Sequence, residues 1–197
     1  MLFAPDTDAS LEFIVALCNT DATASRSGHD ELLTIPELTR LLARHLFTGR
    51  VDHDDAELRE VRQTRALLRR VWTLSRDDAV AEVNRMLAEA HALPQLARHD
   101  DSDWHLHATT ATAPLAERMR VEASLALTDV IRSNEVARLR LCEADACSGL
   151  LLDLSRNASK RFCSVRCGNR MNMIAFRERQ DAGATPTGPG RQAQSPR

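Results

Sequence analysis

The sequence predicts an α+β protein that is mostly α, with a helical body, a short β-hairpin, a small C-terminal metal-bound module and a disordered tail. Apolar residues recur at helical spacing through most of residues 1–137, which predicts the helical body. Four of the five cysteines gather in residues 138–180. Residues 181–197 are rich in Gly, Pro and Gln with almost no apolar side chains, which predicts disorder.

Composition sets limits on compartment and partners. The 26 Lys and Arg residues nearly balance the 28 Asp and Glu residues, so any nucleic-acid signal must be local. No apolar run of about 18 residues suggests a membrane span, and the N-terminus lacks the features of a signal peptide. We therefore expect a cytoplasmic protein with no membrane partner, where clustered thiols bind metal instead of forming disulfides.

The first helix is expected to cover residues 11–18, with Asp8 or Ser10 as its N-cap. Cys18 falls on the apolar face of this helix and has no partner nearby in the sequence. We interpret it as a small buried hydrophobe in preference to a reactive thiol. A polar loop over residues 19–30 follows.

A second helix begins at the segment Thr34-Ile35-Pro36-Glu37, which combines an N-cap, an early proline and an acidic first turn. Gly49 is expected to end it. Its apolar stripe consists of Leu38, Leu41, Leu42 and Leu46.

A third, longer helix is expected over residues 52–74, with a row of arginines opposite its apolar face. The row comprises Arg59, Arg62, Arg65, Arg69 and Arg70. It could contact phosphates, but a solvated face paired with acids of the same helix is favoured.

A fourth helix, residues 77–90, should be capped by Ser75. Strands over 95–99 and 104–109 then form a hairpin around the turn at 100–103. His105 and His107 alternate along the second strand and so share one face. A metal half-site is one interpretation, but an ordinary half-exposed strand is favoured because no third ligand is near in the sequence.

The last helix of the body should span residues 114–133, opened by Pro114. The alternating segment 138–141 then leads as a strand into the cysteine-rich module.

The four cysteines of this module have the spacing of a tetrahedral zinc site. Four residues separate Cys142 from Cys147, three separate Cys163 from Cys167, and fifteen lie between the pairs. Strands at 150–154 and 161–162, a turn at 155–159 and a helix capped by Ser164 give the order knuckle, hairpin, helix. This order is that of a treble-clef-like zinc finger with Zn²⁺ as its cofactor, and it is favoured over four incidental cysteines.

Charge is the second feature of the module. Four thiolates around one divalent ion leave a formal charge of about minus two. Seven basic residues and one acid, Glu178, lie between residues 155 and 180, which exceeds what neutralisation requires. Such a local cationic surface is typical of phosphate-backbone binding. The basic residues are Arg156, Lys160, Arg161, Arg166, Arg170, Arg177 and Arg179.

These residues also carry a family resemblance. The segments 154–157, Phe162-Cys163-Ser164 and Cys167-Gly168-Asn169-Arg170 resemble the CGNR zinc-finger family, and the body around 31–34 is similar to the ABATE domain found before such fingers. The resemblance implies a candidate stress-induced transcription regulator of bacteria whose zinc finger is assigned to DNA binding.

The chain departs from the family pattern in two places. The second cysteine pair has three intervening residues where the family has four. The helix after the tetrapeptide is often basic in the family but is largely apolar here, over residues 171–176. We therefore expect Ile174 and Phe176 to pack on the finger or on the body, which argues against those positions reading DNA.

Roles within the finger follow from the residues and the resemblance together. Gly168 should permit close backbone approach beside the metal. Asn169 and Arg170 either touch nucleic acid or hold the knuckle and hairpin backbone, and the structural role is favoured. The ligands are Cys142, Cys147, Cys163 and Cys167, and the candidate phosphate contacts are Arg156, Lys160, Arg161 and Arg166.

The function expected is a DNA-binding transcription regulator, and the alternative is a zinc-stabilised protein-interaction module without DNA binding. An enzyme is not expected, because four thiolates leave zinc no open position and no nucleophile or phosphate-loop motif is present. The sequence is compatible with a homodimer, and it identifies no effector for the body.

Overall fold

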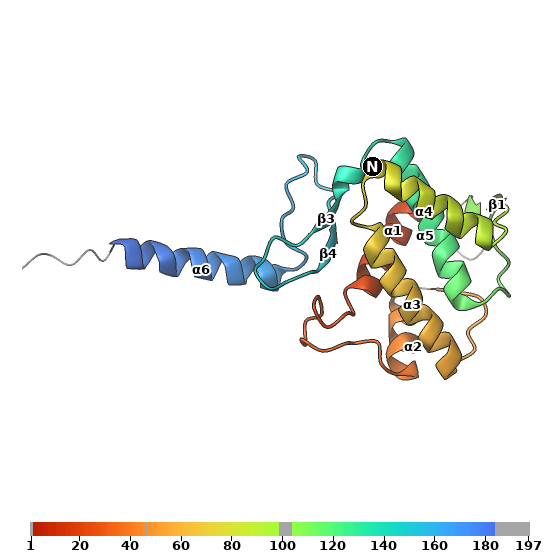
Figure 1. The fold of residues 1–197 in the computed structure, drawn as a ribbon, viewed down its shortest axis with the longest axis horizontal. Helices are drawn as coiled ribbons and strands as arrows, with labels where there is room; N and C mark the ends of the chain where they lie inside the picture. Colours follow the sequence, from red (N-terminus) through yellow and green to blue (C-terminus); the bar gives the residue numbers. More distant parts are fainter. Residues whose placement is uncertain (1, 46, 99–103, 184–197) are drawn as a thin grey trace, which may run out of the picture.

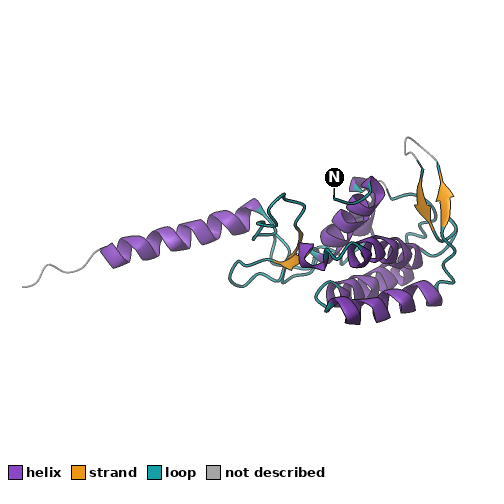
Figure 2. Ribbon diagram, turned by 90° about the horizontal axis from the view of Figure 1, so that it is seen from above, coloured by secondary structure: helices purple, strands orange, loops and turns teal. Residues whose placement is uncertain are grey.

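The computed structural model describes residues 2–45, 47–98 and 104–183. Helices dominate, and two small antiparallel hairpins, β1–β2 and β3–β4, accompany them. The predicted mostly helical α+β class is confirmed (Figures 1 and 2). In chain order the elements are α1 Pro5–Cys18, α2 Ile35–Arg44, α3 Asp55–Val71, α4 Arg76–Glu89, β1 Gln95–Ala97, β2 His105–His107, α5 Leu115–Arg132, the 3₁₀ turn Val136–Arg138, β3 Leu139–Leu141, β4 Leu150–Leu152 and α6 Val165–Gly183.

The core of the body forms around α5, which packs against α1, α3 and α4. Leu11, Leu68 and Met119 are fully buried where these helices meet. Full burial of such a side chain stabilises the fold by about 1.5–3 kcal/mol, which offsets the backbone ordering cost of only one or two residues, so the whole set of buried side chains is needed to hold the helices together. Leu150 and Leu152 of β4 join the same core, which brings the finger's hairpin into the body.

Capping residues start the helices largely where the sequence predicts. Thr34 and Glu37 form a reciprocal capping box at α2, and Ser75 accepts the amide of Asp78 at α4. The predicted start of α1 is wrong, because the helix begins at Pro5, whose restricted φ suits a first helical position. The predicted end of α2 at Gly49 is also wrong: the helix ends at Arg44, and Gly49 adopts a φ of +90° in the loop beyond.

The predicted third-helix arginine face is not a solvated row paired within one helix. Arg65 is only 6% exposed and binds both oxygens of Asp30, in the 19–30 loop, at 2.6 and 2.7 Å. Arg69 donates to the carbonyl oxygens of Cys18 and Ser148 at 2.8 and 3.0 Å. The long arginine stems reach across the surface of α3 to neighbouring segments, so these residues tie elements together.

The first hairpin is shorter than predicted. β1 pairs with β2 so that Gln95 faces His107 and Ala97 faces His105. His105 and His107 share a half-buried face of β2, as the alternation predicts. The predicted turn at 100–103 and Leu46 of the predicted apolar stripe lie outside the described residues.

Helix α6 projects from the finger away from the body (Figures 1 and 2). Phe176 on it is 47% exposed and Met173 is 52% exposed, so the prediction that Phe176 packs on the finger or body is wrong. Only the first turn of α6 lies beside the zinc ligands, and the direction of the helix carries Phe176 out of reach.

Residues 181–183 of the predicted tail continue α6, and 184–197 lie outside the described residues. Within the described chain, no helix combines the length and apolarity needed to cross a bilayer.

Candidate metal centre

The knuckle that carries the first two thiols sits at the end of the β3–β4 hairpin. Cys142 follows β3 directly and donates its amide to the Gly149 carbonyl at 2.8 Å, which continues the ladder past Leu141 and Leu150. The Cys147 amide donates to the Ala144 carbonyl at 3.2 Å and closes the turn. The hairpin therefore delivers both cysteines to one point.

The strand predicted at residues 161–162 is not formed. The segment instead runs beside the knuckle as irregular backbone, where the Arg161 carbonyl accepts the amide of Glu143 at 2.9 Å. One such bond is too little to build a ladder, but it is enough to bring Cys163 opposite the knuckle.

The four sulfur atoms have the geometry of a zinc tetrahedron. The Sγ atoms of Cys147, Cys163 and Cys167 lie 3.7, 3.8 and 3.8 Å from one another. A tetrahedral ion with zinc–sulfur bonds of about 2.3 Å requires sulfur–sulfur edges of about 3.8 Å. Ligand atoms of all four cysteines, including Cys142, lie within 4.8 Å of one another. The residues fit Zn²⁺ bound by four thiolates.

Backbone amides and a helix start surround the thiols with donors. Cys142 and Cys147 each accept a backbone amide at 3.4 Å, from Cys163 and Gly149. Ser164 accepts the amide of Cys167 at 3.2 Å, so it caps α6 as predicted. The anionic sulfurs are thus placed where unpaired N–H groups of a helix N-terminus favour negative charge.

The pKa values of the thiols show why a cation belongs here. Burial, and then the neighbouring thiols Cys142 and Cys147, raise the pKa of Cys163 above that of a free cysteine. Burial also raises the pKa of Cys147. For Cys167, burial opposes ionisation, but hydrogen bonds from Ser164 and the other thiols outweigh it and lower the pKa. Four thiolates can coexist only with a cation among them, and bound zinc supplies that charge.

The backbone passes close to the ligand sulfur atoms at Gly149. A Cβ on Gly149 would lie 2.7 Å from the sulfur of Cys163 and 3.3 Å from that of Cys147. A Cβ on Gly168 would meet only the Phe162 ring at 3.4 Å, which is ordinary contact. The close approach predicted at Gly168 is therefore made by Gly149. The position of Gly149, two residues after the ligand Cys147, is the feature of the sequence that indicates this role.

Comparison with known families agrees with this geometry. The CGNR zinc finger family matches residues 138–180. The ABATE family, described as "Putative stress-induced transcription regulator", matches residues 11–132, which is more than half of the chain. The chain belongs to the ABATE family. No curated protein matches it.

Within the CGNR finger, the basic residues predicted to touch phosphate are all exposed but differ in how their charge is balanced. Arg161 binds Glu143 at 2.6 Å, so its charge is largely neutralised. Lys160 donates from its ammonium to the Leu152 carbonyl at 3.2 Å. Arg156 makes no hydrogen bond or ion pair with any described residue.

Arg166 and Arg170 of the CGNR finger bind neutral oxygens. Arg166 donates to the Arg26 carbonyl of the ABATE domain, and Arg170 donates to the Asp145 carbonyl of the knuckle. The contact of Arg170 is the structural role favoured from the sequence. Asn169, its neighbour in the tetrapeptide, has an exposed side chain.

Asp153 is a structural residue of the finger that sequence reasoning missed. It is fully buried and accepts the amides of Ser155 and Lys160 and the guanidinium of Arg140. These hydrogen bonds, acting against burial, lower the pKa of Asp153. An aspartate two residues before a serine is a turn signal that could have identified it.

Proposed function

We propose that this ABATE-family protein is a cytoplasmic transcription regulator that binds duplex DNA through its CGNR finger and α6. The observation that carries the proposal is α6 itself. It has 19 residues, or about 28 Å, and beyond its first turn, where Arg166 donates to the Arg26 carbonyl, it projects away from the body (Figure 1). A free helix of this length, anchored by a rigid zinc site, has the dimensions of an element that enters a DNA groove.

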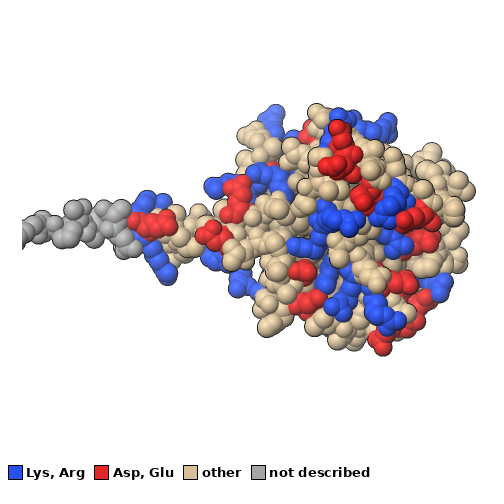
Figure 3. All heavy atoms as spheres, viewed as in Figure 1, with Lys and Arg blue, Asp and Glu red and all other residues tan. Residues whose placement is uncertain are grey.

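The charges on α6 support a phosphate-binding role. Arg166, Arg170 and Arg177 are exposed and recur at intervals of four and seven, so they form one stripe along the helix. Because Arg166 and Arg170 bind carbonyl oxygens, their positive charge is not cancelled, and each guanidinium retains further N–H donors. On the face of the body that Figure 3 shows, basic and acidic side chains are interspersed, so this face offers no extended cationic patch.

A salt titration of DNA binding tests the proposal. The zinc-loaded chain is titrated against labelled genomic duplex by fluorescence anisotropy at several salt concentrations. The slope of log K against log salt should fall by about 0.9 for each phosphate contact removed. The test variant carries Arg156→Gln, Arg166→Gln and Arg170→Gln, because glutamine keeps a donor for the backbone carbonyls while removing the charge.

The matched control is Arg59→Gln, an exposed arginine near the start of α3, at the end of that helix remote from the finger. It should leave both affinity and slope unchanged. Zinc chelation should abolish binding, because α6 loses its anchor. Absence of affinity at low salt, or an unchanged slope in the triple variant, would refute DNA binding by this surface.

A second candidate function is a protein-interaction module, which the apolar side chains of α6 favour. Val165, Met173 and Phe176 are 81%, 52% and 47% exposed. Exposed apolar residues on one helix are typical of a surface that docks another protein. This candidate predicts a folded, zinc-loaded protein without affinity for DNA at low salt. In either case we propose that the zinc is structural and that the protein is not an enzyme, because four thiolates leave no open coordination position.

A further inference from the structure

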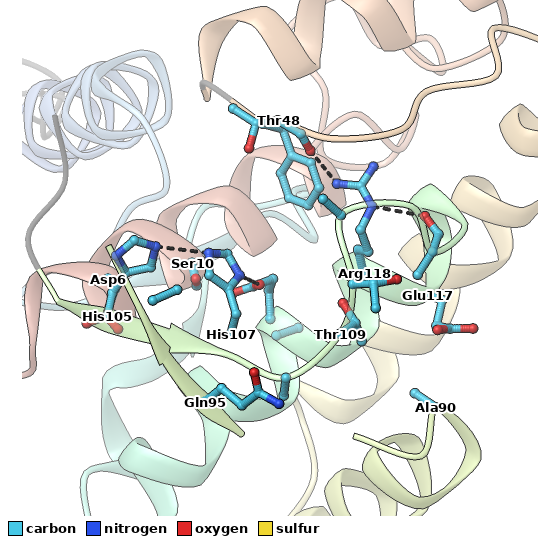
Figure 4. A pocket seen from close by; sticks show the side chains of 18 of the residues that line it. Asp6, Ser10, Thr48, Ala90, Gln95, His105, His107, Thr109, Glu117 and Arg118 are labelled. Atoms are coloured by element: carbon cyan, nitrogen blue, oxygen red, sulfur yellow. Dashed lines mark hydrogen bonds and ion pairs between the residues drawn. The ribbon is translucent and has the colours of Figure 1, made fainter. Parts of the chain in front are cut away.

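A cavity of about 900 Å³ lies in the ABATE domain, between α1, the β1–β2 hairpin and the start of α5. The β1–β2 hairpin that forms one wall lies at the end of the body away from β3 and β4 of the CGNR finger (Figure 1), and Figure 4 shows the lining side chains. Its volume is in the range of pockets that enclose small organic ligands. The residues that decide its chemistry are Phe13, Phe47, Trp104, Arg118, His107 and Glu122.

One wall of the pocket is aromatic. The rings of Phe13 and Phe47 lie 5.0 Å apart between centroids, and His45 meets Phe13 edge-on at 5.4 Å. Burial lowers the pKa of His45, so its ring is neutral near pH 7 and behaves as part of this wall. Trp104 also lines the pocket and is 63% exposed, although large aromatic side chains are normally well buried. These side chains favour a flat, apolar ligand.

Arg118 places a buried positive charge against this wall. It is 6% exposed, and its guanidinium carbon lies 5.4 Å from the centre of the Phe47 ring. Its partners are three carbonyl oxygens, those of Thr48, Arg50 and Ala113, and none of the described residues gives it a carboxylate. A guanidinium has five N–H donors, so donors remain after these three bonds. Burial lowers the pKa of Arg118, and the charges of Glu57 and Glu122, which act from a distance, only partly oppose this effect. An anion in direct contact with Arg118 would offset the remaining cost of burying its charge.

A second polar cluster of the pocket, His105, His107 and Glu122, is internally paired (Figure 4). The Nε2 atoms of His105 and His107 lie 2.9 Å apart, and Nδ1 of His107 lies 3.1 Å from the Glu122 carboxyl. A metal ion here would need a third protein ligand. Throughout the described ranges, the four finger cysteines are the only group of three or more residues with that geometry. Asp6 and Glu117 also bring carboxylates to the lining, so Arg118 is the group among these that can bind an anion.

We propose that this pocket binds a small aromatic carboxylic acid in its anionic form. The ring packs against Phe13 and Phe47, and the carboxylate accepts hydrogen bonds from the remaining donors of Arg118. A ring on Phe47 brings an attached carboxylate to Arg118 because the guanidinium already lies beside that ring. The site is independent of the DNA-binding proposal, and its test contains no DNA.

The test compares three probes that share the phenylpropenyl skeleton and differ in the terminal group: cinnamate is an anion, cinnamyl alcohol is neutral and cinnamylamine is a cation. Binding of each to the full, zinc-loaded chain is measured by isothermal titration calorimetry. Cinnamate should bind with a Kd about tenfold lower than cinnamyl alcohol, a difference of about 1.4 kcal/mol, because a carboxylate accepts stronger hydrogen bonds from a guanidinium than a neutral hydroxyl does. Cinnamylamine should bind more weakly than both, since Arg118 repels it.

Three variants connect the result to the pocket. Arg118→Gln should remove the preference for cinnamate, whereas Arg120→Gln should keep it, because Arg120 lies on the same helix but binds Thr64 at 3.1 Å. Since Arg118→Gln also frees the loop carbonyls, Ser10→Trp serves as a second disruption. It fills the pocket from α1, leaves Arg118 in place and should block cinnamate. Equal affinity for the three probes, no binding of any, or cinnamate affinity retained in both disruptive variants would overturn the proposal.

Discussion

Distances between single atoms decide which residue types can lie beside the zinc site, and two glycines show this most directly. Gly149 has no room for a side chain beside the sulfur of Cys163, whereas Gly168 has ordinary space beside Phe162. The cysteine pattern could be read from the sequence because metal coordination demands a ligand spacing. The difference between the glycines could not, because it depends on which backbone passes closest to the sulfurs after folding.

Replacing each glycine with alanine should therefore have opposite results. Gly149→Ala should lower zinc affinity by about 10–100-fold, because the added methyl group must displace a ligand sulfur. Gly168→Ala should leave affinity unchanged and stabilise α6 by up to about 1 kcal/mol, since alanine is the better helix former. Competition with a chromophoric chelator measures both. Equal zinc affinities in the two variants would contradict the assignment of the close approach to Gly149.

The reactivity of the thiols should divide the five cysteines into two classes. Burial raises the pKa of Cys18 to about 12, so it remains a protonated, inaccessible thiol near neutral pH. In a thiol-reagent assay, the native zinc-loaded protein should show no fast reaction. Chelation should release the four thiols of the site, and denaturant should add Cys18 as the fifth.

Matched serine variants check this division. Cys163→Ser should reduce bound zinc and loosen the finger, while Cys18→Ser should leave zinc content unchanged. A fast-reacting thiol in the zinc-loaded wild type that disappears in zinc-loaded Cys18→Ser would show that Cys18 is reactive.

At the scale of elements, one ion pair organises the segment between α1 and α2. Arg65 of α3 donates twice to Asp30, and Arg62 approaches the same carboxylate at 3.7 Å. The hydrogen bonds from Arg65 are the main reason why the pKa of Asp30 is lower than its usual value of 3.8. Asp30 itself accepts the amide of Leu32, a fully buried residue, so the pair positions the loop on the core.

Asp30→Asn should destabilise the fold by about 2–3 kcal/mol, because it leaves the charge of Arg65 buried and unpaired. A carboxyl with a depressed folded-state pKa contributes stability above its unfolded pKa, and that contribution is lost as pH falls through the folded value. The wild type should therefore lose stability below about pH 4, and Asp30→Asn should lack this part of the acid dependence. Denaturant midpoints measured across pH check the prediction. Glu60→Gln, on the exposed face of α3, is the control and should follow the wild type.

Local chemistry explains which elements the sequence predicts well. Thr34 with Glu37, Ser75 and Ser164 start helices because a cap acts within one turn and its signal is local. Predictions of burial were wrong where the burial of a side chain depends on segments that are distant in the sequence. Phe176 looks like a core residue by hydrophobicity, but the direction of α6 keeps it exposed, and Arg65 looks solvated although Asp30 buries it.

At the scale of the whole molecule, the CGNR finger and the ABATE domain are joined by specific hydrogen bonds. Asn19, just after α1, both donates to and accepts from the backbone of Leu150, at 2.9 and 2.7 Å. Trp72, just after α3, donates from its indole to the Arg140 carbonyl at 3.2 Å. Leu150 is 1% exposed within the body's core, so β4 belongs to the finger by sequence and to the body by packing.

This junction predicts that zinc stabilises the ABATE domain as well as the finger. Free zinc at about a thousandfold its Kd stabilises a folded protein by about 4 kcal/mol. For a chain of this size, that corresponds to a Tm shift of roughly 8–16 °C.

Unfolding of the body is followed through the fluorescence of Trp72 in a Trp104→Phe background, since Trp72 is 2% exposed at the junction. Chelation should shift this transition down, and Asn19→Ala should reduce the shift because β4 is then tied less firmly to α1. Asn84→Ala, an exposed substitution on α4, is the control. A Trp72 transition that does not move on chelation would mean that the two parts unfold independently, despite the hydrogen bonds between them.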